Sequence, residues 1–247
     1  MRNVLLAAGT ALLAATAAPL AAQSSGNGYL FGTPDARLSL HAGYAHANAK
    51  SDLFDFVIEN LTVERSAFSG PSIGVDLALT LAPRADLTFS LDYAAAITDS
   101  EDRRYAEGAD DLPIQQTTSF RRVPVTANAI FYLTPRGRSV GKLAWIPAKV
   151  VPWLGAGGGA MWYRFRQEGD FVDYQTLNIF TSTLQSSGWA PMAQALGGVD
   201  VTLSPRFAVT LDGRYTWAKG SLSNDFTDFA KIDLSGVTGS LGITVRL

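Results

Sequence analysis

The chain has 247 residues, 47% of them hydrophobic, and a formal net charge of −2 at pH 7. It contains no cysteine, which excludes disulfides, thiol catalysis and thiolate metal sites, and its two histidines do not make a metal site by themselves. Because no segment is strongly basic, nucleic acid is not an expected partner, and no motif predicts a cofactor.

The N-terminus has the organisation of a secretory signal. Residues 1–3 carry one positive charge, residues 4–13 are largely apolar, and residues 14–22 are mostly alanine. This pattern predicts a signal peptide at 1–22, cleaved after Ala22, followed by a periplasmic N-terminal segment at 23–36. A single membrane anchor is the alternative, although its apolar core is shorter than the roughly 20 residues that a spanning helix needs.

Apolar and polar residues then alternate with period two, which predicts β-strands. No later window approaches 18 continuous apolar residues, so the chain either is soluble or crosses a membrane as strands of a closed barrel. The alternation predicts eight strands, at 37–47, 72–81, 87–94, 120–133, 150–164, 189–203, 207–217 and 240–247.

The connections between these strands alternate in length. Tight turns are predicted at Ala82-Pro83-Arg84, Thr134-Pro135-Arg136 and Ser204-Pro205-Arg206, because proline suits the second position of a turn. Long polar loops are predicted at 48–70, 97–117, 165–188 and 218–231. This order is typical of an antiparallel barrel with both termini at the end that carries the short turns.

The residue types on the two strand faces bear on the choice between a membrane barrel and a soluble one. A soluble lipocalin-type barrel also alternates, with its apolar face turned inward. Here the polar face holds Ser, Thr, Gly, Ala, Asp and a few Arg, while every Lys and Glu is expected in loops, turns or strand ends. Aromatic residues gather near strand ends, as in an interfacial girdle. The predicted fold class is therefore all-β: a single closed antiparallel transmembrane β-barrel of about eight strands at 37–247, with short periplasmic turns and long extracellular loops.

The C-terminal strand resembles the signal that the outer-membrane barrel assembly machinery reads. Gly242, Val245 and Leu247 match its glycine and its alternating apolar positions, although the chain ends in Leu where Phe is common. With the N-terminal signal and the loop order, the chain resembles the small eight-stranded OmpA, OmpX and OmpW type of barrel. The resemblance implies a bacterial outer membrane, with outer-membrane lipid, lipopolysaccharide and the assembly machinery as partners.

Several charged residues fall on the inward parity of the strands. In a narrow barrel they must pair, since an isolated buried charge costs several kcal/mol. One interpretation is a network that seals the lumen, and the other is a charged constriction that selects ions. The candidates for this lumen network are Asp76, Asp92, Asp200, Asp212, Arg214, Arg246 and Arg122, with Arg164 as a further possibility.

The predicted loops also contain apolar residues that solvent exposure does not explain. A stripe at helical spacing begins after Ser51 or Asp52. These residues either pack on one another or form a hydrophobic mouth for a small apolar ligand, as resemblance to OmpW would support. The candidates for the mouth are Leu53, Phe54, Val57, Ile58, Phe171, Phe180, Phe226 and Phe229.

Three functions follow from these features. We favour a non-enzymatic barrel for envelope integrity or surface interaction, with a narrow transporter of small hydrophobic compounds second. A lipid-modifying enzyme is third, because His41 has possible serine neighbours but no paired catalytic motif is present. The loops are acidic in sum, so divalent cations are expected to bridge them to lipopolysaccharide.

Overall fold

The computed structural model describes residues 28–107, 112–141, 143–173, 176 and 178–247. The predicted signal at 1–22 and the first part of the predicted segment 23–36 lie outside the described residues. Both stay predictions.

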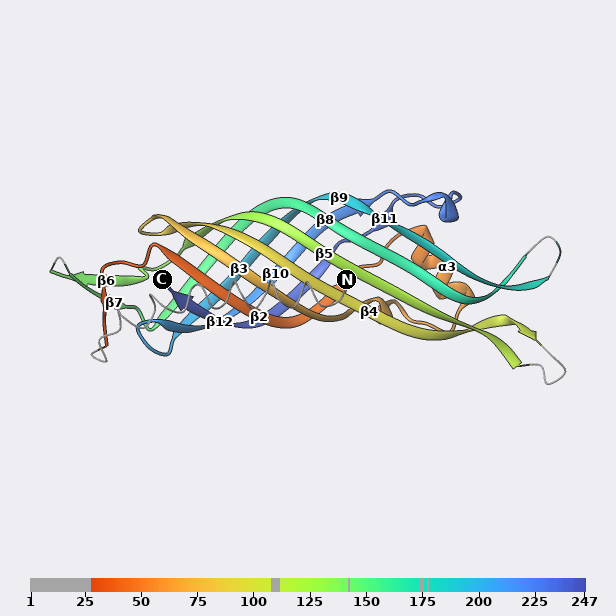
Figure 1. Ribbon diagram of the computed structural model, residues 1–247, viewed down its shortest axis with the longest axis horizontal. Coiled ribbons are helices and arrows are strands. Elements are labelled where there is room, and N and C mark those ends of the chain that lie inside the picture. Colours follow the sequence, from red (N-terminus) through yellow and green to blue (C-terminus); the bar gives the residue numbers. More distant parts are fainter. Residues whose placement is uncertain (1–27, 108–111, 142, 174–175, 177) are drawn as a thin grey trace, which may run out of the picture.

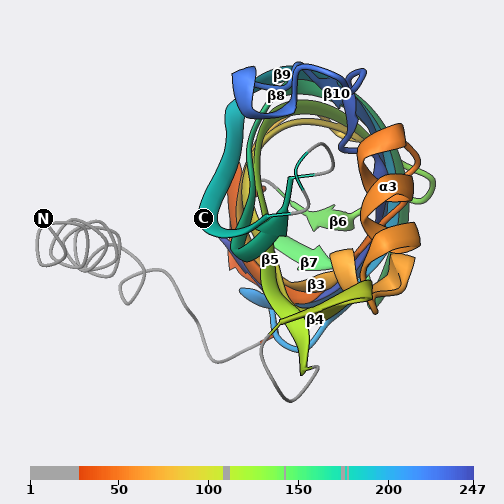
Figure 2. The same ribbon diagram turned by 90° about the vertical axis from the view of Figure 1, so that its right-hand side faces the viewer.

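Eight antiparallel strands form a closed ring (Figures 1 and 2). Each strand pairs with the next along the ring, and the last pairs with the first through Arg246 and Arg37. The predicted closed barrel of eight strands is therefore confirmed. In ring order the strands are β2 (Ala36–Ala47), β3 (Gly70–Ala82), β4 (Ala85–Glu107), β5 (Leu112–Tyr132), β8 (Val150–Val172), β9 (Ile179–Thr202), β10 (Phe207–Gly220) and β12 (Gly236–Arg246).

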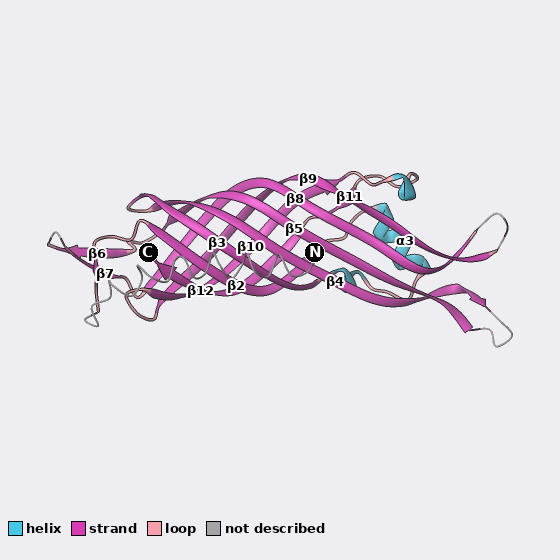
Figure 3. Ribbon diagram, viewed as in Figure 1, coloured by secondary structure: helices cyan, strands magenta, loops and turns pink. Residues whose placement is uncertain are grey.

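Four strands are much longer than predicted. The β4–β5 pairing continues past Ile97 and Ser119, and the β8–β9 pairing continues to Val172 and Ile179. The segments 97–117 and 165–188 were expected to be loops and are mainly two projecting hairpins (Figure 3). The prediction failed because apolar alternation ends where the apolar outer band ends, whereas backbone pairing continues beyond it. We call this the long-hairpin end of the barrel.

The opposite end carries the short connections. The β3–β4 and β9–β10 turns lie at Pro83 and Pro205, as predicted, and we call this the short-turn end. The third predicted turn opens a longer connection between β5 and β8, which contains a small three-stranded sheet that the sequence did not predict. Its strands are β1 (Leu30–Phe31), β7 (Ala144–Pro147) and β6 (Gly137–Val140).

The outer face of the ring is apolar and the inner face is polar. Leu40, Leu211 and Leu241 point outward with 62%, 61% and 58% of their surface exposed, and each of the eight strands contributes exposed large apolar residues. A soluble barrel with an inward apolar face is contradicted. A continuous apolar band around a closed ring is far larger than the patches that soluble monomers expose, so this barrel is built to span a membrane.

The helical elements lie at the long-hairpin end. They are the helix α3 (Asp52–Asn60), the 3-10 turns η1 (Arg65–Phe68) and η2 (Asn224–Phe226), and they are accompanied by the short strand β11 (Ile232–Asp233). Figure 2 shows α3 along one side of the barrel opening. Within the described residues, no helix is both long and apolar enough to cross a membrane.

Candidate functional site

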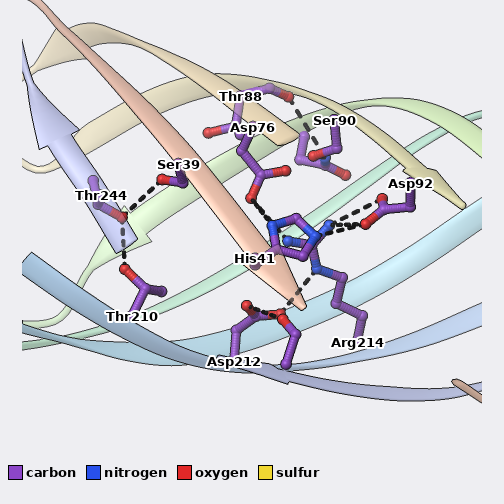
Figure 4. A network of polar contacts seen from close by, with 12 residues as sticks. Ser39, His41, Asp76, Thr88, Ser90, Asp92, Thr210, Asp212, Arg214 and Thr244 are labelled. Atoms are coloured by element: carbon purple, nitrogen blue, oxygen red, sulfur yellow. Dashed lines mark hydrogen bonds and ion pairs between the residues drawn. The ribbon is translucent and has the colours of Figure 1, made fainter. Parts of the chain in front are cut away.

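The middle of the lumen holds a cluster of charges, which we call the central layer (Figure 4). Arg214 donates to three carboxylates, at 2.8 Å to Asp76, 3.2 Å to Asp92 and 2.9 Å to Asp212. The His41 ring lies between two of them, with Nε2 2.7 Å from Asp92 and Nδ1 3.4 Å from Asp76. Only 6% of the Arg214 side chain is exposed, so these charges satisfy one another rather than water.

Strand register brings the central layer together. His41 on β2 is opposite Gly74 on β3, which is opposite Asp92 on β4. A β-carbon at position 74 would overlap both Asp92 Oδ1 and His41 Nε2. Glycine at this position therefore makes room for the contact between the imidazole and the carboxylate.

A second cluster lies closer to the short-turn end. Arg37 donates to Asp200 at 2.7 Å and to Asp86 at 3.0 Å, and also contacts the Tyr132 hydroxyl. Arg136 donates to Asp86 at 2.8 Å. This cluster, which we call the lower layer, supplies two arginines for two buried carboxylates.

Neutral polar side chains fill the space between the charges and the β8 wall. Gln194 donates to Asn128 Oδ1 at 2.7 Å, and Asn128 donates to the hydroxyls of Thr126 and Ser90 at 3.0 and 3.2 Å. The glycine-rich run 155–159 lies on β8, within the strand predicted at 150–164, and a β-carbon at Gly157 would collide with Asn128.

Little free space remains beside the central layer. Two cavities border it, each of about 30 Å³, one on the side of Arg122 and one on the side of Arg37. Such a volume holds only about one or two water molecules. The lumen is therefore filled at this level rather than open to flow.

An apolar cluster closes the long-hairpin end, and we call it the plug. Phe54 of α3 is fully buried and lies 4.6 Å, ring centre to ring centre, from Phe68 of η1. It also lies 5.5 Å from Phe120 on β5 and 5.7 Å from Phe165 on β8. Phe226 of η2 joins at 5.7 Å from Phe165. Loop residues thus pack onto inward-facing wall residues and fill the opening.

The predicted hydrophobic mouth divides into two groups. Leu53, Phe54, Val57 and Phe226 are buried in the plug, and Ile58 and Phe229 pack against it. These residues occupy the opening themselves, so the alternative that they pack on one another describes the structure. Phe171 and Phe180 lie elsewhere, stacked at 6.1 Å on the projecting β8–β9 hairpin.

The predicted lumen network is brought together only in part. Asp76, Asp92, Asp212 and Arg214 meet in the central layer, whereas Asp200 belongs to the lower layer.

Two of the predicted arginines do not pair with a carboxylate in the described residues. Arg122 donates weakly to the Ala45 carbonyl at 3.4 Å, and Arg246 donates to backbone carbonyls and to Thr202. Both side chains are long enough to reach the backbone at the barrel ends. Arg164 points outward because its parity on β8 is opposite to that of Tyr163 and Phe165.

Three residues of the two charged layers were missed, while His41 was considered as a catalytic candidate and not as a member of the charge network. Arg37 shares inward parity with Ser39, which could have marked it as a lumen residue. Asp86 and Arg136 lie beside turns, where no alternation indicates which way a side chain points.

The histidines do not form a nucleophilic pair with the serines considered from sequence. His41 contacts carboxylates, and within the described residues it has no hydrogen bond to Ser39, Ser72 or Ser90. His46 is exposed and its Nδ1 lies 3.1 Å from the Ser69 hydroxyl. Across the part of the chain that the structure describes, no group of three or more acidic or histidine side chains is arranged to hold a metal ion.

The residues of the predicted assembly signal lie on β12. Gly242 faces the lumen opposite His41, while Leu247 follows the strand and its backbone N–H donates to the Ala36 carbonyl at 2.9 Å. Val245 pairs with Leu38. Recognition of these residues by the assembly machinery stays a prediction.

No family model matches the chain, and no curated protein matches it. Among solved structures, it is similar to Neisserial surface protein A, with 14% identity over 87% of this chain and 99% of that one and a TM-score of 0.42. It is also similar to the outer membrane protease OmpT from Escherichia coli, with 10% identity, coverage of 87% and 98%, and a TM-score of 0.41. Outer membrane protein W from E. coli gives 15% identity, coverage of 87% and 100%, and a TM-score of 0.35. These three structures are outer-membrane barrels, and similarity at this level assigns no activity.

Proposed function

We propose that this chain is a non-enzymatic barrel of a bacterial outer membrane, exported by a cleaved signal at 1–22, that serves envelope integrity or surface interaction. The observation that carries this proposal is the filled lumen. The plug, the central layer and the lower layer follow one another along the barrel axis, so a solute would have to displace all three.

The shape of the two ends supports a role at the cell surface. The β4–β5 and β8–β9 hairpins project beyond the rest of the barrel (Figure 1). Phe180 on the second hairpin is 47% exposed, and Phe56 on the outer side of α3 is 41% exposed. Exposed aromatic residues are common anchors in protein interfaces. We therefore assign interaction to this end, and the periplasmic face to the short-turn end where the described chain begins and ends.

The transporter alternative receives less support. The residues expected to receive a hydrophobic compound already contact one another in the plug. A transported compound would have to move α3 first and would then meet the charged central layer.

The proposal can be tested in two steps. The protein should fractionate with outer membranes and should migrate anomalously on gels until heated, because a closed barrel resists unfolding by detergent. Recovery in the soluble periplasm would refute the location. Liposomes containing the folded protein should retain potassium chloride and a small sugar, and should take up a small apolar dye no faster than empty liposomes. Protein-dependent efflux or uptake would refute the closed lumen.

A further inference from the structure

Three arginines share the outer face of two neighbouring strands at the long-hairpin end. Arg121 on β5 lies directly opposite Arg164 on β8, and Arg166 is the next outward residue along β8. Like charges directly opposite each other across a strand pair are destabilising. The folded chain therefore holds these positive charges close together at a cost to its own stability.

The surrounding chain does not neutralise this group. Within the described residues, neither Arg121 nor Arg164 has a carboxylate within 4 Å or any hydrogen-bond acceptor, and the Nε atoms of all three arginines lack a partner. Arg166 pairs with Glu168 at 2.8 Å, which leaves an excess of positive charge on the face. The unused donors distinguish these arginines from Arg214 in the lumen, which contacts three carboxylates.

The position of the group along the barrel is also informative. Trp162, the outward residue immediately before Arg164, pairs across the strands with Trp189, which is 63% exposed. The Arg164 guanidinium lies 5.2 Å from the Trp162 ring centre. Exposed tryptophans mark the boundary between the hydrocarbon core and the headgroups of a membrane. Since two residues of a strand span about 7 Å, the arginines lie at headgroup level, just above that boundary.

We propose that Arg121, Arg164 and Arg166 form a binding site for a phosphate group of an outer-leaflet lipid. A guanidinium presents a planar fork of donors that matches phosphate oxygens, and a phosphate between Arg121 and Arg164 would turn their repulsion into attraction. The apolar face below the tryptophans would hold the acyl chains of the same molecule. This inference rests on the proposed place of the barrel in an outer membrane, with the long-hairpin end outward.

The site adds a direct contact to the expectation that divalent cations bridge the acidic loops to anionic lipid. The summed charge of a loop does not reveal a local positive patch on the wall. Direct contact through arginine is expected to persist when divalent cations are removed by a chelator.

Native mass spectrometry of the folded protein in detergent tests the proposal. The probes are a bis-phosphorylated diglucosamine lipid, its dephosphorylated form and inorganic phosphate, all with chelator present. The phosphorylated lipid should bind best. The double variant R121Q/R164Q should bind it at least about tenfold more weakly, as expected for the loss of charged hydrogen bonds.

The control is R104Q, which removes one positive charge, against two in the double variant, from an exposed position on β4 outside the group. It should bind the phosphorylated lipid as the unmodified protein does, and every variant should retain the gel shift of a folded barrel. Equal binding of phosphorylated and dephosphorylated lipid, or equal weakening by R104Q, would overturn the site. Binding of inorganic phosphate as tight as that of the lipid would overturn the lipid as its ligand. Because the assay detects neither conductance nor cellular location, its failure would leave the closed lumen standing.

Discussion

The barrel closes its lumen in two chemically different ways. In the central layer, Arg214 on β10 contacts Asp76 on β3 and Asp92 on β4 across the lumen, and it also contacts Asp212 on its own strand. His41 on β2 contacts Asp92. In the plug, aromatic residues from loop elements pack against inward-facing strand residues at the long-hairpin end, and Phe54 contacts three other rings. Where the wall is regular, one arginine can be placed within reach of several carboxylates. At the long-hairpin end, loops pack apolar side chains against the inward-facing wall residues.

The two closures should respond differently when one member is lost. Removing one charge from the central layer leaves other charges buried without a partner, so the penalty falls on the whole barrel. Removing a ring from the plug leaves a cavity whose cost follows its size and the ability of the loop to collapse. Loss of a charge from the central layer should therefore destabilise the whole barrel, whereas loss of a ring from the plug should mainly destabilise the packing of the plug.

The largest effect is expected from Arg214→Ala. It leaves three carboxylates facing each other, and should lower the free energy of unfolding by about 3 to 5 kcal/mol. Urea unfolding of the barrel in lipid vesicles measures this value. Arg104→Ala removes an exposed arginine and should change it by less than about 0.5 kcal/mol. Equal effects of the two changes would mean that the central layer does not hold the wall together.

Phe54→Ala should cost about 3 kcal/mol, at the low end for a buried phenylalanine because the loop can partly collapse. The loss should appear locally, as faster proteolysis of residues 48–69, while the heat-dependent gel shift of the barrel persists. Phe56→Ala, on the same helix but exposed, is the matched control. If Phe54→Ala abolished the gel shift, the plug would be required for the stability of the whole barrel, which would contradict its separate role.

An arginine placed on the outer, lipid-facing surface should destabilise the barrel, although the lumen itself contains arginines. Leu241→Arg places a guanidinium against lipid in the middle of β12 and should cost about 2 to 4 kcal/mol. Val237→Arg, on the same strand and face but near the end of the apolar band, should cost only about 0 to 1 kcal/mol. Similar values at both positions would show that the outward face has been assigned to the wrong environment.

The smallest effect is expected from Gly74→Ala, which adds one methyl group between Asp92 and His41. Overpacking should destabilise the barrel by about 1 to 3 kcal/mol. Gly213→Ala is the control, because no atom lies within 4 Å of its added β-carbon. Thermal unfolding in the same detergent compares them, and an unchanged midpoint for Gly74→Ala would contradict the close packing of the central layer.

The fold was largely predictable from sequence because a membrane-spanning barrel requires apolar residues on its lipid-facing surface. Inside the apolar band, outward residues must be apolar, so strands such as 72–81 and 207–217 show period-two alternation. Beyond the band both faces of a strand meet water, and the hairpin extensions of β4, β5, β8 and β9 have no such pattern. The two- and four-residue strands β1, β6 and β7 are too short for any periodicity to be detected.

The candidate site was less predictable. Inward parity identifies Asp76, Asp92, Asp212 and Arg214 as lumen residues, but parity does not state at which depth each lies. The pairing of Asp200 with Arg37 depends on the register around the closed ring, which no local pattern encodes. The outward pair Arg121 and Arg164 comes from two strands that lie about 40 residues apart in the sequence and meet only through the β5–β8 register.

The central claim is that the lumen is blocked at the plug and at the central layer, and single-channel recording of the unmodified protein in a planar bilayer tests it most directly. The gel shift of the same preparation should first establish that the barrel is folded. We expect no steady current at constant voltage, because the two cavities described beside the central layer have volumes of only about 30 Å³ each. A steady, ion-selective current would contradict the account and would identify the charged layers as the lining of a pore.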